Sequence, residues 1–170
     1  YFSTKLKEIA AMQSRGIRVI NLGVGSPDLP PSPEAVAALN EAAANPKNHA
    51  YQSYIGVPAL REAFADWYRT WYGVSLNPAN EILPLVGSKE GIMHIAMTYL
   101  EPGDQVLVPN PGYPTYRAAS LLTGATVVDY TLDEANGWLP DLAALSRTDL
   151  SRVKLMWVNY PHMPTGAQAT

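Results

Sequence analysis

The sequence predicts an α/β fold with a mainly parallel, doubly wound sheet. Short apolar runs rich in β-branched residues, at 105–108, 125–130 and 153–159, alternate with segments of helical periodicity. The run at 105–108 is nearly continuously apolar, which is typical of a strand covered on both faces. A Gly-Ser turn after 83–86 leads from an apolar run into a helical segment. Ligands of such sheets bind at turns of this kind, beyond the carboxyl ends of the strands.

The first elements are expected to be a helix, a strand and a second helix. Residues 3–14 have an amphipathic pattern, and residues 18–22 (RVINL) look like a short strand that runs into the Gly- and Pro-rich loop 23–28. Ser32 is a good N-cap for a helix that has proline at its first position and continues to Ala44.

The next stretch is expected to be a polar loop followed by a helix. Residues 45–55 lack periodicity and contain Tyr51 and Tyr54, which suit contacts with a partner as well as packing. Pro58 begins a helix, and a loop follows at 73–80. The helix carries an apolar and aromatic stripe, which we interpret as a packing face: Leu60, Ala63, Phe64, Trp67 and Trp71.

The central stretch, 83–116, is expected to hold the binding site. Residues 83–86 look like a strand, and Gly87-Ser88 opens a helix that ends at 101–104, where proline and glycine stop it. The free N–H groups at the start of this helix suit a phosphate or another anion. The spacing predicts one buried face on the helix: Ile92, Ile95, Ala96, Tyr99 and Leu100.

The remaining chain continues the alternation. It predicts a helix at 113–122, a strand at 125–130, a short helix at 140–146 and a strand at 153–159. The strand ends then carry Gly87-Ser88, the loop 110–113 and the loop 160–166.

Composition excludes several classes of function. The net charge of −3, the pI near 5.5 and the lack of a Lys/Arg-rich run predict no binding to nucleic acid. The absence of cysteine excludes disulfides, thiolate metal sites and a cysteine nucleophile. With no apolar run of membrane-spanning length and no signal peptide, we expect no membrane partner and a cytoplasmic protein. The chain starts without methionine and stops at Thr170, so we also expect a fragment.

Common catalytic motifs are missing. The G-x-G-x-x-G and G-x-x-x-x-G-K-[ST] phosphate loops, the G-x-S-x-G elbow and any His/Asp/Glu spacing of a metal site are absent. Tyr113, at a strand end near the Gly-Ser turn, could stack on a flat ring or be a buried aromatic with its hydroxyl bonded. The residues alone therefore indicate a phosphate-bearing ligand and leave an aromatic ring open.

Five motifs in order resemble the class I/II aminotransferases, which are pyridoxal-phosphate enzymes of fold type I. They are LGVGSPD, Tyr51 with Gly56 and Leu60-Arg61, VGSKEGI, EPGDQVLVPNPGYPTY and NYPHMPTG, and they span residues 19–166. The resemblance implies the fold of these transferases. Residues 1–44 would be an N-terminal segment of the small domain with its connection, and residues 45–170 the first part of a truncated large domain.

The resemblance also implies the site and its cofactor, pyridoxal 5'-phosphate. Gly87, Ser88 and Lys89 would form the phosphate cradle, and Tyr113 would stack on the pyridine ring. Gly25 would bind the substrate carboxylate through its backbone. Tyr51 would reach the cofactor phosphate of the other subunit, which implies a homodimer.

Two features depart from the family pattern. The family's N-P-T-G loop, whose asparagine bonds the ring oxygen of the cofactor, reads Met163-Pro-Thr-Gly here, and a thioether cannot donate that bond. Either another residue supplies it or the ring electronics differ. The lysine that forms the Schiff base, the acidic partner of the pyridine nitrogen and the substrate-binding arginine lie beyond Thr170 in family members. No catalytic residue is therefore expected in this stretch, and it would be inactive alone.

The resulting hypothesis is an aminotransferase of amino acid metabolism that transfers an amino group between an amino acid and a 2-oxo acid. Met163 keeps open a second reaction on the same fold, such as a carbon–sulfur lyase. A third reading is a non-catalytic, aminotransferase-like domain that senses a ligand.

Overall fold

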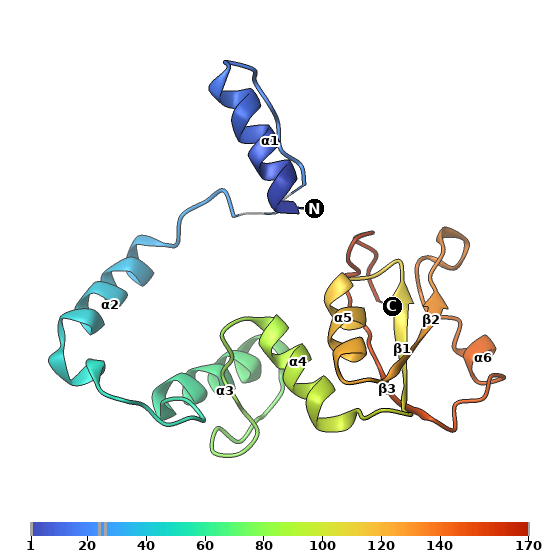
Figure 1. The fold of residues 1–170 in the computed structure, drawn as a ribbon. Coiled ribbons are helices and arrows are strands. Elements are labelled where there is room, and N and C mark those ends of the chain that lie inside the picture. The colour runs from blue at the N-terminus through green and yellow to red at the C-terminus, as the bar shows by residue number, and fades with distance from the viewer. Residues whose placement is uncertain (1, 24, 26, 170) are drawn as a thin grey trace. The chain divides into compact units, whose positions relative to one another are not determined.

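The computed structural model describes residues 2–23, 25 and 27–169, in two compact units (Figure 1). The first unit comprises Tyr1–Gln52 and the second Ser53–Thr170. Among the described residues, no helix has both the length and the apolar character needed to cross a bilayer.

The N-terminal unit is helical. It contains α1 (Phe2–Ser14), α2 (Pro33–Ala44) and the short 3-10 helix η1 (Pro46–His49). Ser32 caps α2 as predicted, because its hydroxyl accepts a hydrogen bond of 3.2 Å from the Ala35 N–H. The strand expected at 18–22 is wrong. A strand is stable only beside another strand, and the side chains of Ile20 and Leu22 are exposed here.

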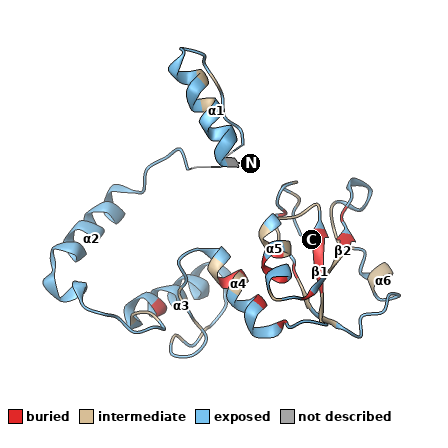
Figure 2. Cartoon of the chain, in the orientation of Figure 1, coloured by how far each residue is buried: buried red, intermediate tan, exposed pale blue. Residues whose placement is uncertain are grey.

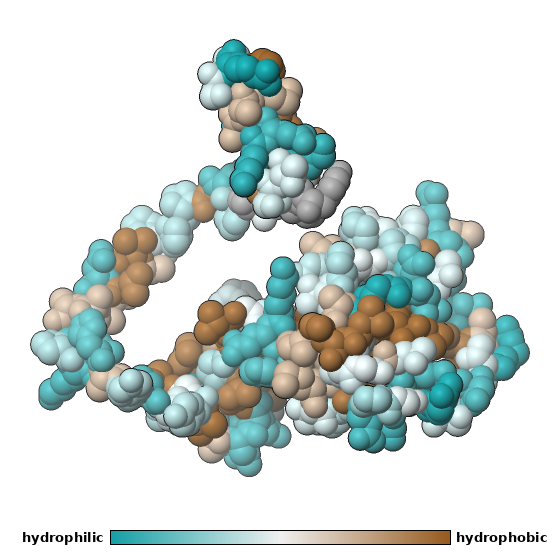
Figure 3. All heavy atoms as spheres, viewed as in Figure 1, coloured by the Kyte–Doolittle hydropathy of each residue, from teal (hydrophilic) through white to brown (hydrophobic). Residues whose placement is uncertain are grey.

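The C-terminal unit begins with α3 (Pro58–Tyr72), which ends at Gly73 in a left-handed C-cap. Arg61 is its buried residue, and the Nη1 group donates to the carbonyls of Pro78 and Ala79 at 2.9 and 3.1 Å. The aromatic stripe does not pack into the core of this chain. Trp67 and Trp71 are 54% and 66% exposed, and Figure 3 shows hydrophobic surface over this part of the chain.

Three parallel strands form the sheet, in the order β2-β1-β3. They are β1 (Gln105–Asn110), β2 (Thr126–Thr131) and β3 (Val153–Met156). Val106 pairs with Val127 on one side and with Leu155 on the other. The parallel α/β architecture is therefore confirmed, whereas the strand expected at 83–86 is wrong because this extended segment has no strand partner among the described residues.

Both faces of the sheet are covered, as the apolar run of β1 predicted. Helices α4 (Ser88–Tyr99) and α5 (Pro114–Leu122) cover one face. The other face is covered by Trp138, which follows the 3-10 helix η2 (Glu134–Asn136), and by α6 (Leu142–Leu145). Figure 2 shows buried residues concentrated in β1, α4 and α5. The core beneath α4 and α5 (the α4/α5 core) consists of Ile92, Ala96, Leu100, Val106, Val108, Tyr116, Ala119, Ala125 and Trp157.

The buried face predicted for α4 is partly wrong. Ile92, Ala96 and Leu100 are buried, but Ile95 and Tyr99 are 41% and 65% exposed. The helix contacts the sheet and α5 along a narrower stripe than the five apolar positions suggested.

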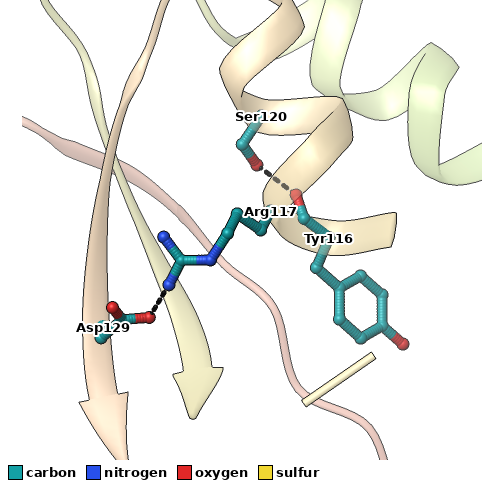
Figure 4. Close-up of polar contacts among 4 residues, drawn as sticks. All are labelled: Tyr116, Arg117, Ser120 and Asp129. Carbon is teal, nitrogen blue, oxygen red and sulfur yellow. Dashed lines mark hydrogen bonds and ion pairs between the residues drawn. The ribbon is translucent and has the colours of Figure 1, made fainter. Parts of the chain in front are cut away.

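Polar contacts fasten α5 to the sheet. Arg117 forms an ion pair with Asp129 of β2 (Figure 4). The fully buried Ser120 hydroxyl donates to the Tyr116 carbonyl at 2.8 Å and accepts from the Trp157 indole N–H at 3.1 Å. On the opposite face, the Tyr130 hydroxyl donates to the Trp157 carbonyl at 2.6 Å. Trp157 is thus held from both sides, just beyond β3.

We expect Tyr130→Phe to destabilise the full-length protein by about 1 kcal/mol at pH 8, because the Trp157 carbonyl loses its buried donor. Burial raises the pKa of Tyr130 from 10.0 to about 12. Between these two values the folded state keeps a proton that the unfolded state releases, so wild-type stability falls as the pH rises. The variant lacks this decline, and the gap between the two proteins should close by pH 11.

Urea unfolding midpoints at pH 8 and pH 11 measure this change. Tyr99→Phe, at a tyrosine that is 65% exposed, is the control and should match wild type at both pH values. A gap of constant size for Tyr130→Phe would contradict the prediction.

Candidate functional site

The N-terminus of α4 is an open set of backbone donors. Its N-cap, Gly87, has φ 91° and ψ 154°, a conformation that is essentially restricted to glycine. No side chain caps this helix, whereas Ser32 caps α2. A Cβ at Gly87 would meet nothing within 4 Å, so the turn borders open space. The first N–H groups of α4 remain available to an anion, and the helix dipole favours one there.

Glu90, in the first turn of α4, stabilises the Gly87 turn through a hydrogen bond. Its carboxylate accepts a hydrogen bond of 2.6 Å from the Val86 N–H, just before Gly87. Glu90 was not among the site residues predicted from the sequence. The signal was present, because an acidic residue three positions after an N-cap often bonds back to the preceding backbone.

Lys89 and Tyr113 are brought together by the fold. The Lys89 ammonium lies 5.8 Å from the centroid of the Tyr113 ring, in the range of a cation–π contact. A hydrogen bond with Thr115 lowers the pKa of Tyr113, and the charge of Lys89 lowers it further. Tyr113 and Tyr116 are in edge-to-face contact, with their ring centroids 5.6 Å apart. Tyr116 in turn stacks on Trp157, with a centroid distance of 5.1 Å. The ring at the strand end is therefore supported by the α4/α5 core.

The loop 110–113, which presents Tyr113, is tightly folded. A Cβ on Gly112 would lie 2.5 Å from the Pro109 carbonyl oxygen, so only glycine fits at this position.

His162 joins this loop to the loop that follows β3. Its ring is buried, with Nε2 3.2 Å from the Pro111 carbonyl and Nδ1 2.7 Å from the Thr165 hydroxyl. Because a carbonyl only accepts, we assign the proton to Nε2. His162 is thus a bridge between the two strand-end loops that carry Tyr113 and Met163. A scattered histidine gave no hint of this role in the sequence, because the bridge spans 51 residues.

Met163 is 53% exposed on the second loop. Its backbone N–H donates to the Asn159 side-chain oxygen at 3.2 Å. Sequence reasoning also missed Asn159, which lies three residues beyond the end of β3.

Gly25 and Tyr51 lie in the N-terminal unit. Gly25 is exposed, and a Cβ there would meet nothing within 4 Å. Tyr51 is fully exposed, with a relative accessibility of 106%. The substrate and cofactor roles expected for these two residues stay predictions.

The arrangement suits an anion attached to a flat ring. Backbone donors and a lysine lie at the start of α4, and an aromatic face lies at the end of β1. Across the part of the chain that the structure describes, no three His, Asp or Glu side chains group to hold a metal ion.

Comparison with known proteins identifies the family. The family model for aminotransferase class I and II matches residues 17–170. The chain belongs to the class I and II aminotransferases. The resemblance to this family is therefore confirmed, and the cofactor of these aminotransferases is pyridoxal phosphate.

Several curated proteins that are named as aminotransferases are similar to the chain. The LL-diaminopimelate aminotransferases of Dehalococcoides mccartyi (strain CBDB1) and Moorella thermoacetica are each 48% identical over 163 residues, which cover 96% of this chain and 42% of theirs. The chain thus spans about two fifths of the length of these curated relatives.

Solved structures agree with this assignment. Apo-BacF from Bacillus subtilis matches with a TM-score of 0.93 and 43% identity, over 99% of this chain and 43% of BacF. A probable N-succinyldiaminopimelate aminotransferase from Thermus thermophilus matches with a TM-score of 0.87 and 35% identity, over 99% of this chain and 45% of that one. The expected transferase fold is therefore confirmed for the portion present.

We expect Gly87→Ala to weaken binding of pyridoxal phosphate by the full-length protein about tenfold or more. A side chain at φ 91° costs of order 1–3 kcal/mol, and relief of this strain turns the cradle N–H groups away. A titration that follows cofactor absorbance measures the dissociation constant.

Gly103→Ala is the matched control. Gly103 has φ 105° and equally open surroundings, but it lies in the turn between α4 and β1. It should lower the melting temperature and leave the dissociation constant unchanged. Equal losses of affinity in both variants would show that the cradle is not at Gly87.

Proposed function

We propose that the whole protein is a pyridoxal-phosphate-dependent aminotransferase that moves an amino group between an amino acid and a 2-oxo acid. The observation that carries the proposal is the uncapped start of α4 at Gly87, with Lys89 and the Tyr113 ring beside it. This combination matches a ligand that has both a phosphate and a planar ring. Family membership supports the same ligand.

In this proposal the phosphate lies at the start of α4. The backbone N–H groups at Gly87 and Ser88 and the Ser88 hydroxyl donate to its oxygens, and the Lys89 charge adds attraction. Glu90 keeps the turn in place through Val86, so its carboxylate is engaged away from the anion.

The ring of the cofactor stacks on Tyr113. Lys89, Tyr116 and the tight turn at Gly112 restrict how Tyr113 can move, which limits the ordering needed on binding. When bound, pyridoxal phosphate supplies an electron sink for negative charge at the substrate α-carbon. The residues of this chain bind and orient; Gly25 takes the substrate carboxylate.

The relatives suggest which substrate to assay first. Proteins named LL-diaminopimelate aminotransferase are 48% identical to this chain, so LL-diaminopimelate is the first amino donor to test. The remaining proposals are a homodimer in which Tyr51 contacts the partner's cofactor, and a cytoplasmic location.

The deciding experiment uses the full-length protein with pyridoxal phosphate, reduction by borohydride and mass spectrometry of the peptides. We expect one cofactor per chain, attached to a lysine outside residues 1–170, and amino transfer from LL-diaminopimelate or another amino acid. Release of pyruvate without amino transfer would replace the proposal by a lyase. Absence of a reducible adduct would favour a ligand-sensing domain.

We expect Tyr113→Leu to weaken cofactor binding roughly tenfold, because the stacking face is lost. Tyr113→Phe keeps the ring and should bind within about threefold of wild type. The same absorbance titration separates them. Similar losses for both would assign the effect to the hydroxyl and argue against stacking at Tyr113.

A further inference from the structure

Met163 removes from the loop after β3 the side-chain donor that the family's asparagine offers to the ring oxygen of the cofactor. Pyridoxal phosphate carries a ring oxygen that accepts hydrogen bonds, and neither the thioether nor the engaged N–H of Met163 can serve it. A replacement at these strand ends needs a side chain with a free hydrogen-bond donor.

Asn159 has one. Its side-chain oxygen accepts the Met163 N–H at 3.2 Å, which fixes the oxygen toward Met163 and turns the amide nitrogen, Nδ2, the other way. Among the hydrogen bonds of the described residues, none uses this Nδ2. Asn159 is also partly buried, so its orientation is restrained.

The chain direction places Asn159 on the Tyr113 side of the sheet. Leu155 and Trp157 pack in the α4/α5 core, as Tyr113 does, whereas Met156 packs on the opposite face. Trp157 continues the pairing with Leu107, since its N–H donates to that carbonyl at 3.0 Å. Exposure alternates beyond it, with Trp157 buried, Val158 53% exposed and Asn159 partly buried. Two residues after Trp157, Asn159 therefore follows the same face.

The His162 bridge brings this loop to the Tyr113 loop. Because its Nε2 bonds the Pro111 carbonyl, two residues before Tyr113, the loop after β3 is tied to the loop that presents Tyr113. Asn110 is the other asparagine at this edge. It is exposed and its side chain makes no hydrogen bond to another described residue, so it is less preorganised than Asn159.

We propose that Asn159 donates a hydrogen bond from Nδ2 to the ring oxygen of pyridoxal phosphate. This assignment rests on the proposed cofactor. Asn159 then does two things at once: its oxygen fixes the Met163 backbone, and its nitrogen binds the cofactor.

The test compares variants of the full-length protein by the dissociation constant of pyridoxal phosphate and by the pH dependence of the bound cofactor's absorption. Asn159→Ala should weaken binding about tenfold, as expected for loss of one hydrogen bond to an ionised oxygen. The pH midpoint of the absorption change should rise, since the donor stabilises the ionised form.

Asn159→Asp isolates the donor. It keeps an oxygen for the Met163 N–H and replaces Nδ2 by an acceptor, so the loop should hold while the affinity falls at least as far as in Asn159→Ala. Adding Met163→Asn to Asn159→Ala supplies a new amide donor on the same loop and should recover most of the loss. Asn136→Ala is the control, because its amide bonds the Leu139 carbonyl in an exposed turn. It should bind like wild type.

Three results would overturn the proposal. The first is wild-type affinity and absorption in both Asn159 variants. The second is loss of affinity in Asn110→Ala but not in Asn159→Ala. The third is full cofactor binding by Asn159→Asp with only a lower melting temperature. If wild type itself binds no pyridoxal phosphate, the proposed function fails, and Asn159 has no cofactor to bind.

Discussion

Burial of β1 on both faces is the constraint on which the rest of this structure depends. An apolar strand of this kind needs a neighbour on each side and a layer above and below. Strands β2 and β3 supply the neighbours, and α4 and α5 supply one layer. Because all three strands are parallel, their carboxyl ends meet at one edge. The loops that carry Tyr113 and Met163 therefore meet as a consequence of packing.

In the proposed site, backbone groups bind the phosphate and side chains bind the ring of the cofactor. In the proposal, the anion is bound mainly through backbone N–H groups at the start of α4, where Gly87 is the N-cap. Ring contacts depend on individual side chains, such as Tyr113 and Asn159. Under this proposal a change at Met163 leaves the backbone cradle intact, because the cradle lies on a different element, and the Asn159 amide is already bonded to the Met163 backbone.

Local signals predicted much of this fold. The sequence correctly predicted three features that residues close in sequence specify: the cap at Ser32, the turn at Gly87 and the buried run of β1. The failures at 18–22 and 83–86 have one physical cause: a short apolar run becomes a strand only if a partner strand lies beside it, and the local sequence does not contain that information. The sequence did not predict the His162 bridge or the contact between Asn159 and Met163 for a related reason. Both depend on how the loop after β3 folds back. Exposure of Ile95 depends on which surfaces are available to α4.

The outward face of α3 bears on how the protein can be handled. The rings of Trp67 and Trp71 lie side by side and tilted, as do those of Tyr68 and Tyr72, and all four rings are exposed in this chain. Apolar surface of this extent is a liability for solubility. A recombinant piece that ends at Thr170 should therefore self-associate and scatter light when it is concentrated. Its oligomeric state would then reflect non-specific contacts between exposed aromatic side chains. Intrinsic tryptophan fluorescence gives a direct gauge: emission from α3 should be red-shifted in such a piece, and it should move to the blue wherever a further surface covers the helix.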